Sequence, residues 1–145
     1  MPHSPVPVPA EVFLSHSTAD RGFTAKLADV LRDHGVPVWY SDTNIRGAQQ
    51  WHDEIGAALR RCDWVLVVLT PDAVESRWVK RELLFALQQD RFDGRIAPVL
   101  YRSCNHDELS WTLASLQMVD FREDFDHGCR DLLRIWGIGL RAGET

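Results

Sequence analysis

The chain has 145 residues, which is the length of one domain with a single sizeable core. Its composition, 45% hydrophobic and 26% charged residues, is that of a globular protein rather than a disordered chain. A net charge of −5 at pH 7 argues against a nucleic-acid partner, because an acidic surface repels phosphate groups. The longest apolar runs fall far short of the ~20 residues of a membrane helix, so no membrane association is expected.

The cysteines, histidines and chain ends indicate the setting, the metal content and the domain bounds of the protein. Three scattered cysteines form neither a disulfide framework nor a C-x-x-C pair, which favours a reducing, cytoplasmic setting. The six histidines lack the spacing of metal ligands, so no metal site is expected. We expect a proline-rich leader at 1–10, one domain at 11–140 and a short tail at 141–145. The leader lacks the cationic start and apolar stretch of a signal peptide.

From residue 12 onward, short β-rich runs alternate with amphipathic stretches, the pattern of βαβ units around a parallel sheet. In chain order we expect a strand at 12–17, a helix with apolar residues from 23 to 31, a strand at 36–40, a helix at about 51–61, a strand at 64–69, a helix at about 78–89, strands at 95–101 and 118–121, and a closing helix at about 125–136. Pro71 and Asp72 are expected to open a loop. The strand at 64–69 is apolar throughout, as in a central strand buried on both faces.

These elements predict an α/β fold of the flavodoxin-like type, a five-stranded parallel sheet with helices on both faces. Sites in such sheets lie beyond the carboxyl ends of the strands, here the loops at 15–20, 41–50, 70–78 and 101–109. A phosphoacceptor receiver would need an acidic pair after the first strand and an aspartate after the third. The chain instead has Ser15, His16 and Ser17 at the first position and Thr70 at the second. It also lacks the glycine-rich motifs of dinucleotide folds and P-loops.

A carboxylate and an indole stand out in the helix predicted at about 78–89. Trp78 and Glu82 are four residues apart and share a helix face, whereas Val79 and Leu83 turn to the core. This pair suits cleavage of a glycosidic bond to a cationic leaving group, such as nicotinamide in NAD, which needs no general acid. The carboxylate then stabilises the positive charge that develops on the ribose. By spacing alone, the alternative stays open that Glu82 is a solvated residue and Trp78 covers the core.

Several motifs occur in an order that resembles the TIR (Toll/interleukin-1 receptor) domain family in its bacterial form. They are Val12-Phe13-Leu14-Ser15-His16-Ser17 with Asp20, Gly35-Val36-Pro37-Val38-Trp39-Tyr40, Ile45-Arg46-Gly47 followed by Trp51 and Ile55, the run from Cys62 to Thr70, and Ser76-x-Trp78-x-x-x-Glu82-Leu83. The resemblance covers about Val12 to Trp136 and implies a five-stranded parallel sheet. It also implies cleavage of NAD, as in many bacterial and plant members, into nicotinamide and ADP-ribose or a cyclic variant.

The resemblance also implies roles for individual residues. Glu82 matches the catalytic glutamate of the family and Trp78 its aromatic partner. The other residues implied to bind substrate are Ser15, His16, Trp39 and Arg46. Asp42, Ile45 and Gly47 fall in the BB loop, which gates the pocket in this family and contributes to self-association. NAD is then the substrate, and no separate cofactor is expected.

Two hypotheses about function follow. The first is an NAD+ nucleosidase, acting as a hydrolase or cyclase, whose active site is completed by self-association. Its setting would be bacterial immunity, including antiviral defence, with a partner effector or sensor protein. The second is a non-enzymatic module that binds other TIR domains through the BB loop, as signalling adaptors and virulence effectors do. The presence of Glu82 favours the first hypothesis.

Overall fold

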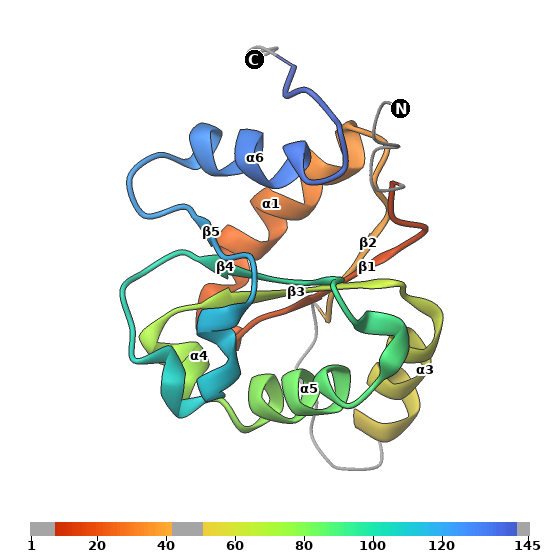
Figure 1. The fold of residues 1–145 in the computed structure, drawn as a ribbon, viewed down its shortest axis with the longest axis vertical. Coiled ribbons are helices and arrows are strands. Elements are labelled where there is room, and N and C mark those ends of the chain that lie inside the picture. The colour runs from red at the N-terminus through yellow and green to blue at the C-terminus, as the bar shows by residue number, and fades with distance from the viewer. Residues whose placement is uncertain (1–7, 42–50, 142–145) are drawn as a thin grey trace.

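The computed structural model describes residues 8–41 and 51–141, which form one five-stranded sheet with helices on both faces (Figure 1). The strands are β1 (Val12–Ser15), β2 (Val38–Trp39), β3 (Trp64–Leu69), β4 (Ile96–Leu100) and β5 (Val119–Asp120). The α-helices are α1 (Arg21–Asp33), α3 (Gly56–Arg61), α4 (Pro71–Glu75), α5 (Arg77–Leu87) and α6 (Phe125–Arg134). Single-turn elements are η1 (Thr18–Asp20), η2 (Trp51–Ile55), η3 (Asp90–Phe92), η4 (His106–Glu108) and η5 (Trp111–Ser115). The predicted fold class is therefore confirmed.

The sheet is parallel throughout, with the strand order β2-β1-β3-β4-β5. The chain therefore moves from β1 outward to β2 and then returns past β1 to β3. The boundary between β1 and β3 is the topological switch point, where helices leave the sheet toward opposite faces. Figure 1 shows α1 and α6 on one face and α3, α4 and α5 on the other. A crevice is expected at the carboxyl ends of the strands beside this boundary.

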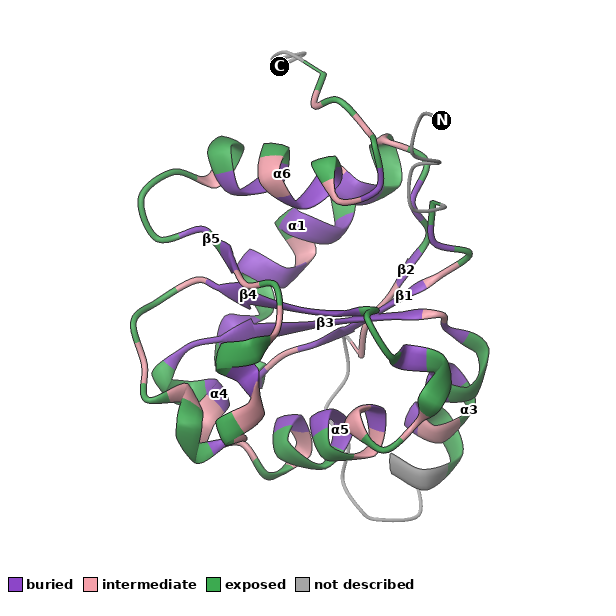
Figure 2. Cartoon of the chain, in the orientation of Figure 1, coloured by how far each residue is buried: buried purple, intermediate pink, exposed green. Residues whose placement is uncertain are grey.

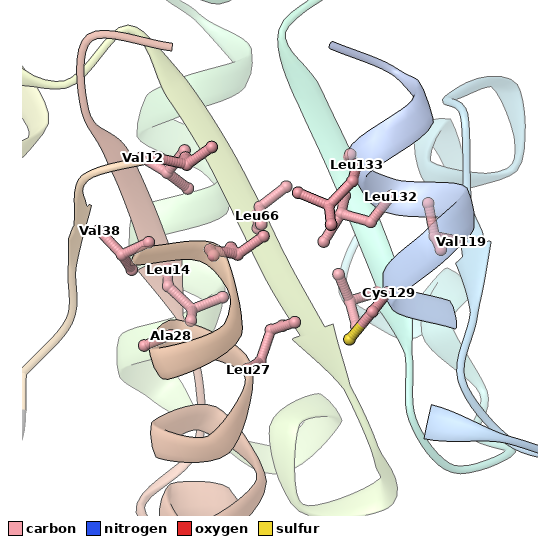
Figure 3. Packing of buried hydrophobic residues seen from close by; sticks show 14 of the residues in the cluster. Val12, Leu14, Leu27, Ala28, Val38, Leu66, Val119, Cys129, Leu132 and Leu133 are labelled. Carbon is pink, nitrogen blue, oxygen red and sulfur yellow. The ribbon is translucent and has the colours of Figure 1, made fainter. Parts of the chain in front are cut away.

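Two hydrophobic layers hold the helices to the sheet, because successive strand residues point to opposite faces. Val12 and Leu14 of β1 pack toward α1 and α6, in the cluster that Figure 3 shows. Phe13, the residue between them, packs into the second cluster with α3 and α5. All six residues of β3 are buried, which confirms its prediction as the central strand, and the strands form the purple layer in Figure 2.

The outer strand β2 is shorter than the predicted 36–40, because the chain closes the end of helix α1 before the strand begins. Gly35 adopts a positive φ of 83° at the end of α1, a conformation that favours glycine. The backbone N–H of Val36 then donates to the carbonyl of Leu31, and the carbonyl of Pro37 accepts from Val12. The carbonyl of Pro37 thus also bonds to β1, but only Val38 and Trp39 are paired with β1 in register.

The loop predicted at Pro71 and Asp72 is wrong, because these residues begin the short helix α4. The Oγ1 atom of Thr70 accepts a hydrogen bond from the backbone N–H of Ala73 and so caps this helix. Proline is tolerated in a first helical turn, where its missing N–H has no partner to lose. Five residues are too few for a helical repeat of apolar positions, so the sequence pattern gave no sign of α4.

In the part of the chain that the structure describes, the helices are too short or too polar to cross a membrane.

Candidate functional site

A small cleft lies at the carboxyl edge of the sheet, beside the ends of β1 and β2 and the first turns of α5. Its cavity volume is about 50 Å³, enough for a few water molecules. The residues that line it are Phe13, Leu14, His16, Thr18, Arg21, Trp39, Ser41, Ile55, Ser76, Trp78 and Glu82. The cleft thus lies where the topology of the sheet predicts a site.

Glu82 is buried, with 6% of its surface exposed, and its carboxylate lies at the wall of the cleft. Helix α5 places it there, since Val79 and Leu83 on the adjoining flank are fully buried against the sheet. The Oγ atom of Ser15 donates a hydrogen bond of 2.6 Å to Oε1 of Glu82. The alternative of a solvated Glu82 is therefore wrong. A carboxylate removed from water in this way has a strong field and few mobile water dipoles to weaken it.

Trp78 lies one turn before Glu82 and lines the same cleft, half-buried. Ser76 caps α5 by accepting a hydrogen bond from the backbone N–H of Val79, so the helix begins just before the indole. The guanidinium of Arg81 lies over the indole, 5.2 Å from the ring centroid. Trp78 and Glu82 thus line one cleft, as expected of residues four positions apart on one helix face.

His16 and Trp39 line the cleft from the ends of β1 and β2. Burial lowers the pKa of His16 below its ordinary value of 6.5, against an opposing contribution from its hydrogen bond with the backbone of Leu14. Its imidazole is neutral near pH 7 and meets the edge of Tyr40 at 5.8 Å between ring centroids. The indole of Trp39 stacks on Phe13 at 5.3 Å. Aromatic rings therefore form much of the apolar wall.

The other predicted site residues are placed differently. Ser15 is 1% exposed and is absent from the lining of the cleft, since it lies behind Glu82. Four residues predicted to bind substrate or form the BB loop lie outside the described residues: Asp42, Ile45, Arg46 and Gly47.

Several residues that line the cleft were not among the predicted site residues. Thr18, Ser41 and Ser76 fall within loops that were expected to face the site, and Arg21 follows directly after one of them. For Thr18, Arg21 and Ser41 the available sequence signal was a position shortly after a strand, whereas Ser76 also begins the motif that contains Trp78 and Glu82. Ile55 belongs to one of the motifs that resemble the TIR family, but no role in the site was predicted for it, and it also packs into the second hydrophobic cluster.

Metal chemistry would need a group of ligands, and thiol chemistry a reactive cysteine, in the described part of the chain. Its histidines, cysteines and acidic residues form no group of three or more that could hold a metal ion. Burial raises the pKa of Cys62 and of Cys129 to about 12, which keeps both thiols protonated at neutral pH. Burial also raises the pKa of Cys104. The chemistry that this cleft offers is electrostatic, a buried carboxylate beside aromatic rings.

Comparisons with known proteins agree with this fold. The model of the TIR domain family matches residues 12–133. The chain is 29% identical over 133 residues to the NAD(+) hydrolase PdTIR of Paracoccus denitrificans, covering 88% of this chain and 44% of that protein. It is 26% identical over 104 residues to the 2' cyclic ADP-D-ribose synthase AbTIR of Acinetobacter baumannii, covering 70% of this chain and 39% of that protein. The chain thus spans less than half the length of these curated relatives.

A solved structure supports the same fold. The metazoan TIR-STING receptor from C. gigas, in complex with 2',3'-cGAMP, superposes with a TM-score of 0.69 at 22% sequence identity. The match covers 94% of this chain and 41% of that chain. At this level of identity the likeness concerns the fold alone, and the resemblance noted in the sequence motifs is confirmed at the level of the family.

Proposed function

Because this chain belongs to the TIR domain family, we propose that it cleaves the bond between nicotinamide and ribose in NAD. The observation that carries the proposal is the buried Glu82 carboxylate at the wall of a cleft, one helical turn from an indole. The names of two relatives, an NAD(+) hydrolase and a cyclic ADP-ribose synthase, support the same reaction. The two activities differ only in what attacks the ribose.

The reaction follows from the charge of the substrate. When the glycosidic C–N bond breaks, its electron pair goes to the pyridinium nitrogen, and nicotinamide leaves as a neutral molecule. The ribose is left with the positive charge, which Glu82 stabilises most strongly when that charge is fully developed. Water then attacks the ribosyl carbon to give ADP-ribose, or a hydroxyl of the same molecule attacks to give a cyclic product, and in both cases the attacking oxygen loses one proton to the solvent. No general acid is required for the departure.

The neighbouring residues complete the proposed site. Trp78 offers a flat indole on which a planar base stacks. A neutral His16 places no positive charge beside the developing cation, and Trp39 provides apolar surface at the other side of the cleft. Arg46 and the BB loop residues Asp42, Ile45 and Gly47 retain their proposed roles in substrate binding and gating.

The size of the cavity sets a condition on this proposal. Pockets for small molecules usually enclose about 300–1,000 Å³, whereas this cleft encloses about 50 Å³. NAD therefore requires the lining side chains to move apart when it binds. We propose that self-association of the domain accompanies this opening and completes the site, with bacterial immune signalling in the cytoplasm as the setting and an effector or sensor protein as a further partner.

The test is nicotinamide release by the purified protein at high concentration, followed by chromatography, with analysis of the second product. Glu82→Gln should lower turnover about 100-fold or more, because it removes the charge that stabilises the transition state and keeps the side-chain shape. Glu75→Gln is the matched control, since Glu75 is an exposed glutamate on the neighbouring helix α4. Turnover that survives in Glu82→Gln would disprove the mechanism.

A second candidate function is a non-enzymatic module for contacts between TIR domains, and the small cavity is the observation that favours it. This function predicts no nicotinamide release at any protein concentration. It also predicts concentration-dependent association that Glu82→Gln leaves unchanged. The turnover assay distinguishes the candidates, because both include self-association, and sedimentation velocity of the two proteins checks that this association is intact.

A further inference from the structure

Ser15 occupies an unusual place for a residue that was predicted to bind substrate. It ends strand β1, its surface is 1% exposed, and it takes no part in lining the cleft, although His16 beside it does. Its Oγ atom donates a 2.6 Å hydrogen bond to Oε1 of Glu82, a residue 67 positions away. A serine hydroxyl carries a single hydrogen, so while this bond persists Ser15 has no proton to donate to a ribose hydroxyl.

The backbone around Ser15 is well suited to hold a side chain in place. Strand β1 pairs with β2 on one side and with β3 on the other, where Ser15 is in register with Val67. Ser15 points to the same face of the sheet as Phe13, which packs into the cluster beneath α5. The hydroxyl therefore reaches the first half of α5 from a rigid strand, and positions fixed by packed strands are more precise than positions on loops.

The hydrogen bond has two consequences for Glu82. It restricts rotation of the carboxylate, so that the charge stays directed at one place in the cleft. It also favours the ionised carboxylate, which burial by itself would disfavour, because the bond is stronger to a charged acceptor than to a neutral one. Among the described residues that line the cleft with Glu82, two can carry a charge, His16 and Arg21. The carboxylates of η2, Asp53 and Glu54, belong to exposed residues.

We propose that Ser15 is a positioning residue, which holds the Glu82 carboxylate oriented and ionised for NAD cleavage, and that it does not bind NAD itself. This inference rests on the proposed function of Glu82 and revises the role that family resemblance implied for Ser15. A positioning role and a binding role differ in which kinetic constant changes. Loss of a positioning residue lowers kcat, whereas loss of a group that binds substrate and transition state equally raises KM.

The kinetic test compares Ser15→Ala, Ser15→Cys and Ser15→Thr with the unmodified protein. In Ser15→Ala and Ser15→Cys we expect kcat to fall about 10-fold or more with little change in KM, because the strong hydroxyl donor is lost. We also expect the acid limb of the pH profile of kcat to move about one pH unit upward, since Glu82 then ionises less readily. Ser15→Thr keeps the hydroxyl on a residue that suits a strand, and it should restore both properties.

Ser17→Ala is the matched control, because Ser17 is a buried serine two residues further on whose Oγ atom accepts from the backbone N–H of Ala19. It should leave the pH profile in place. A merely structural role for Ser15 would lower the amount of folded protein without moving the pH profile. A rise in KM at constant kcat, or an unshifted profile in both Ser15→Ala and Ser15→Cys, would overturn the inference.

A second measurement does not depend on turnover. The side-chain carboxyl of Glu82 can be followed by ¹³C NMR through a pH titration, with Glu82→Gln used to assign its signal. The midpoint should rise in Ser15→Ala and stay in place in Ser17→Ala. Nicotinamide release without any midpoint change would overturn the role of Ser15 and leave the proposed function standing. A shifted midpoint in a protein that releases no nicotinamide would overturn the proposed function, and with it the catalytic purpose of the bond.

Discussion

Asp20 and Glu82 are both carboxylates buried near the carboxyl edge of the sheet, 5% and 6% exposed. Each accepts a short hydrogen bond from a hydroxyl, Asp20 from Thr70 at 2.5 Å and Glu82 from Ser15 at 2.6 Å. The two carboxylates differ in their surroundings beyond this hydrogen bond. Glu82 lines the cleft, whereas Asp20 is absent from its lining and lies within a network of side chains and helix ends.

The network around Asp20 connects four elements. Thr70, which follows β3, donates to the Asp20 carboxylate and at the same time caps α4. Thr24 of α1 donates from its Oγ1 atom to the backbone carbonyl of Asp20, in η1. These bonds fix the start of α1 relative to the end of β3, on the two sides of the switch point.

Under the proposed function, burial and a short hydrogen bond do not by themselves identify a catalytic carboxylate, because Asp20 has both and does not line the cleft. Charge in a closed network contributes to stability, because removing one partner leaves the other buried and unpaired. Charge at the wall of a cleft remains available to a substrate, and its burial increases its effect on a developing cation.

The largest expected effect separates activity from stability at Glu82. Glu82→Gln should lower NAD turnover about 100-fold or more. Its free energy of unfolding should change by less than about 1 kcal/mol, since the amide oxygen still accepts from Ser15 and a buried charge is removed. Denaturant unfolding of both proteins, together with the turnover assay, checks this. A loss of several kcal/mol would place Glu82 in the same structural class as Asp20.

At the Asp20 network the expected effect is on stability. Thr70→Val keeps the shape of the side chain but removes both the donor to Asp20 and the cap of α4. We expect a loss of about 2–4 kcal/mol in the free energy of unfolding, because a hydrogen bond to a carboxylate and a helix cap are lost together. Turnover per folded molecule should stay within a factor of about two, a change well below one tenfold step in transition-state energy. A selective fall in kcat would show that this network supports catalysis directly.

Thr24→Val is the matched control within the same network, since it is also a fully buried threonine. It removes only the hydrogen bond to the backbone carbonyl of Asp20, a neutral acceptor. The expected loss is about 0.5–1 kcal/mol, the usual contribution of such a bond. Equal effects of the two threonine substitutions in denaturant unfolding would show that the Asp20 charge gives Thr70 no special importance.

The smallest expected effect concerns His16, which lines the same cleft as Glu82. Because burial lowers its pKa in the folded protein, the unfolded chain takes up a proton first as the pH falls through about 6.5. The free energy of unfolding therefore carries no cost from His16 above that pH, and it falls progressively below that pH as the unfolded chain takes up the proton. The melting temperature of His16→Gln should depend less on pH between about 5 and 7 than that of the unmodified protein. An identical pH dependence would contradict the direction of this pKa shift.

Much of this molecule could be predicted from its sequence, because local patterns reflect local physics. Alternating apolar runs and helical repeats predicted the five strands, the parallel sheet and the long helices. The spacing of Trp78 and Glu82 predicted one helix face, and both residues line one cleft. The short helix α4 escaped prediction, since five residues cannot display a helical repeat.

The tertiary structure decided which polar residues face a ligand and which face each other. Asp20 and Thr70 are 50 positions apart, and Ser15 and Glu82 are 67 apart, so no local spacing signals either hydrogen bond. Sequence patterning determines which flank of an element is buried, because burial of apolar side chains follows the repeat of the backbone. The partner that a buried hydroxyl or carboxylate meets is determined only when strands and helices from distant parts of the chain pack together, since a buried polar group must find its hydrogen bond there.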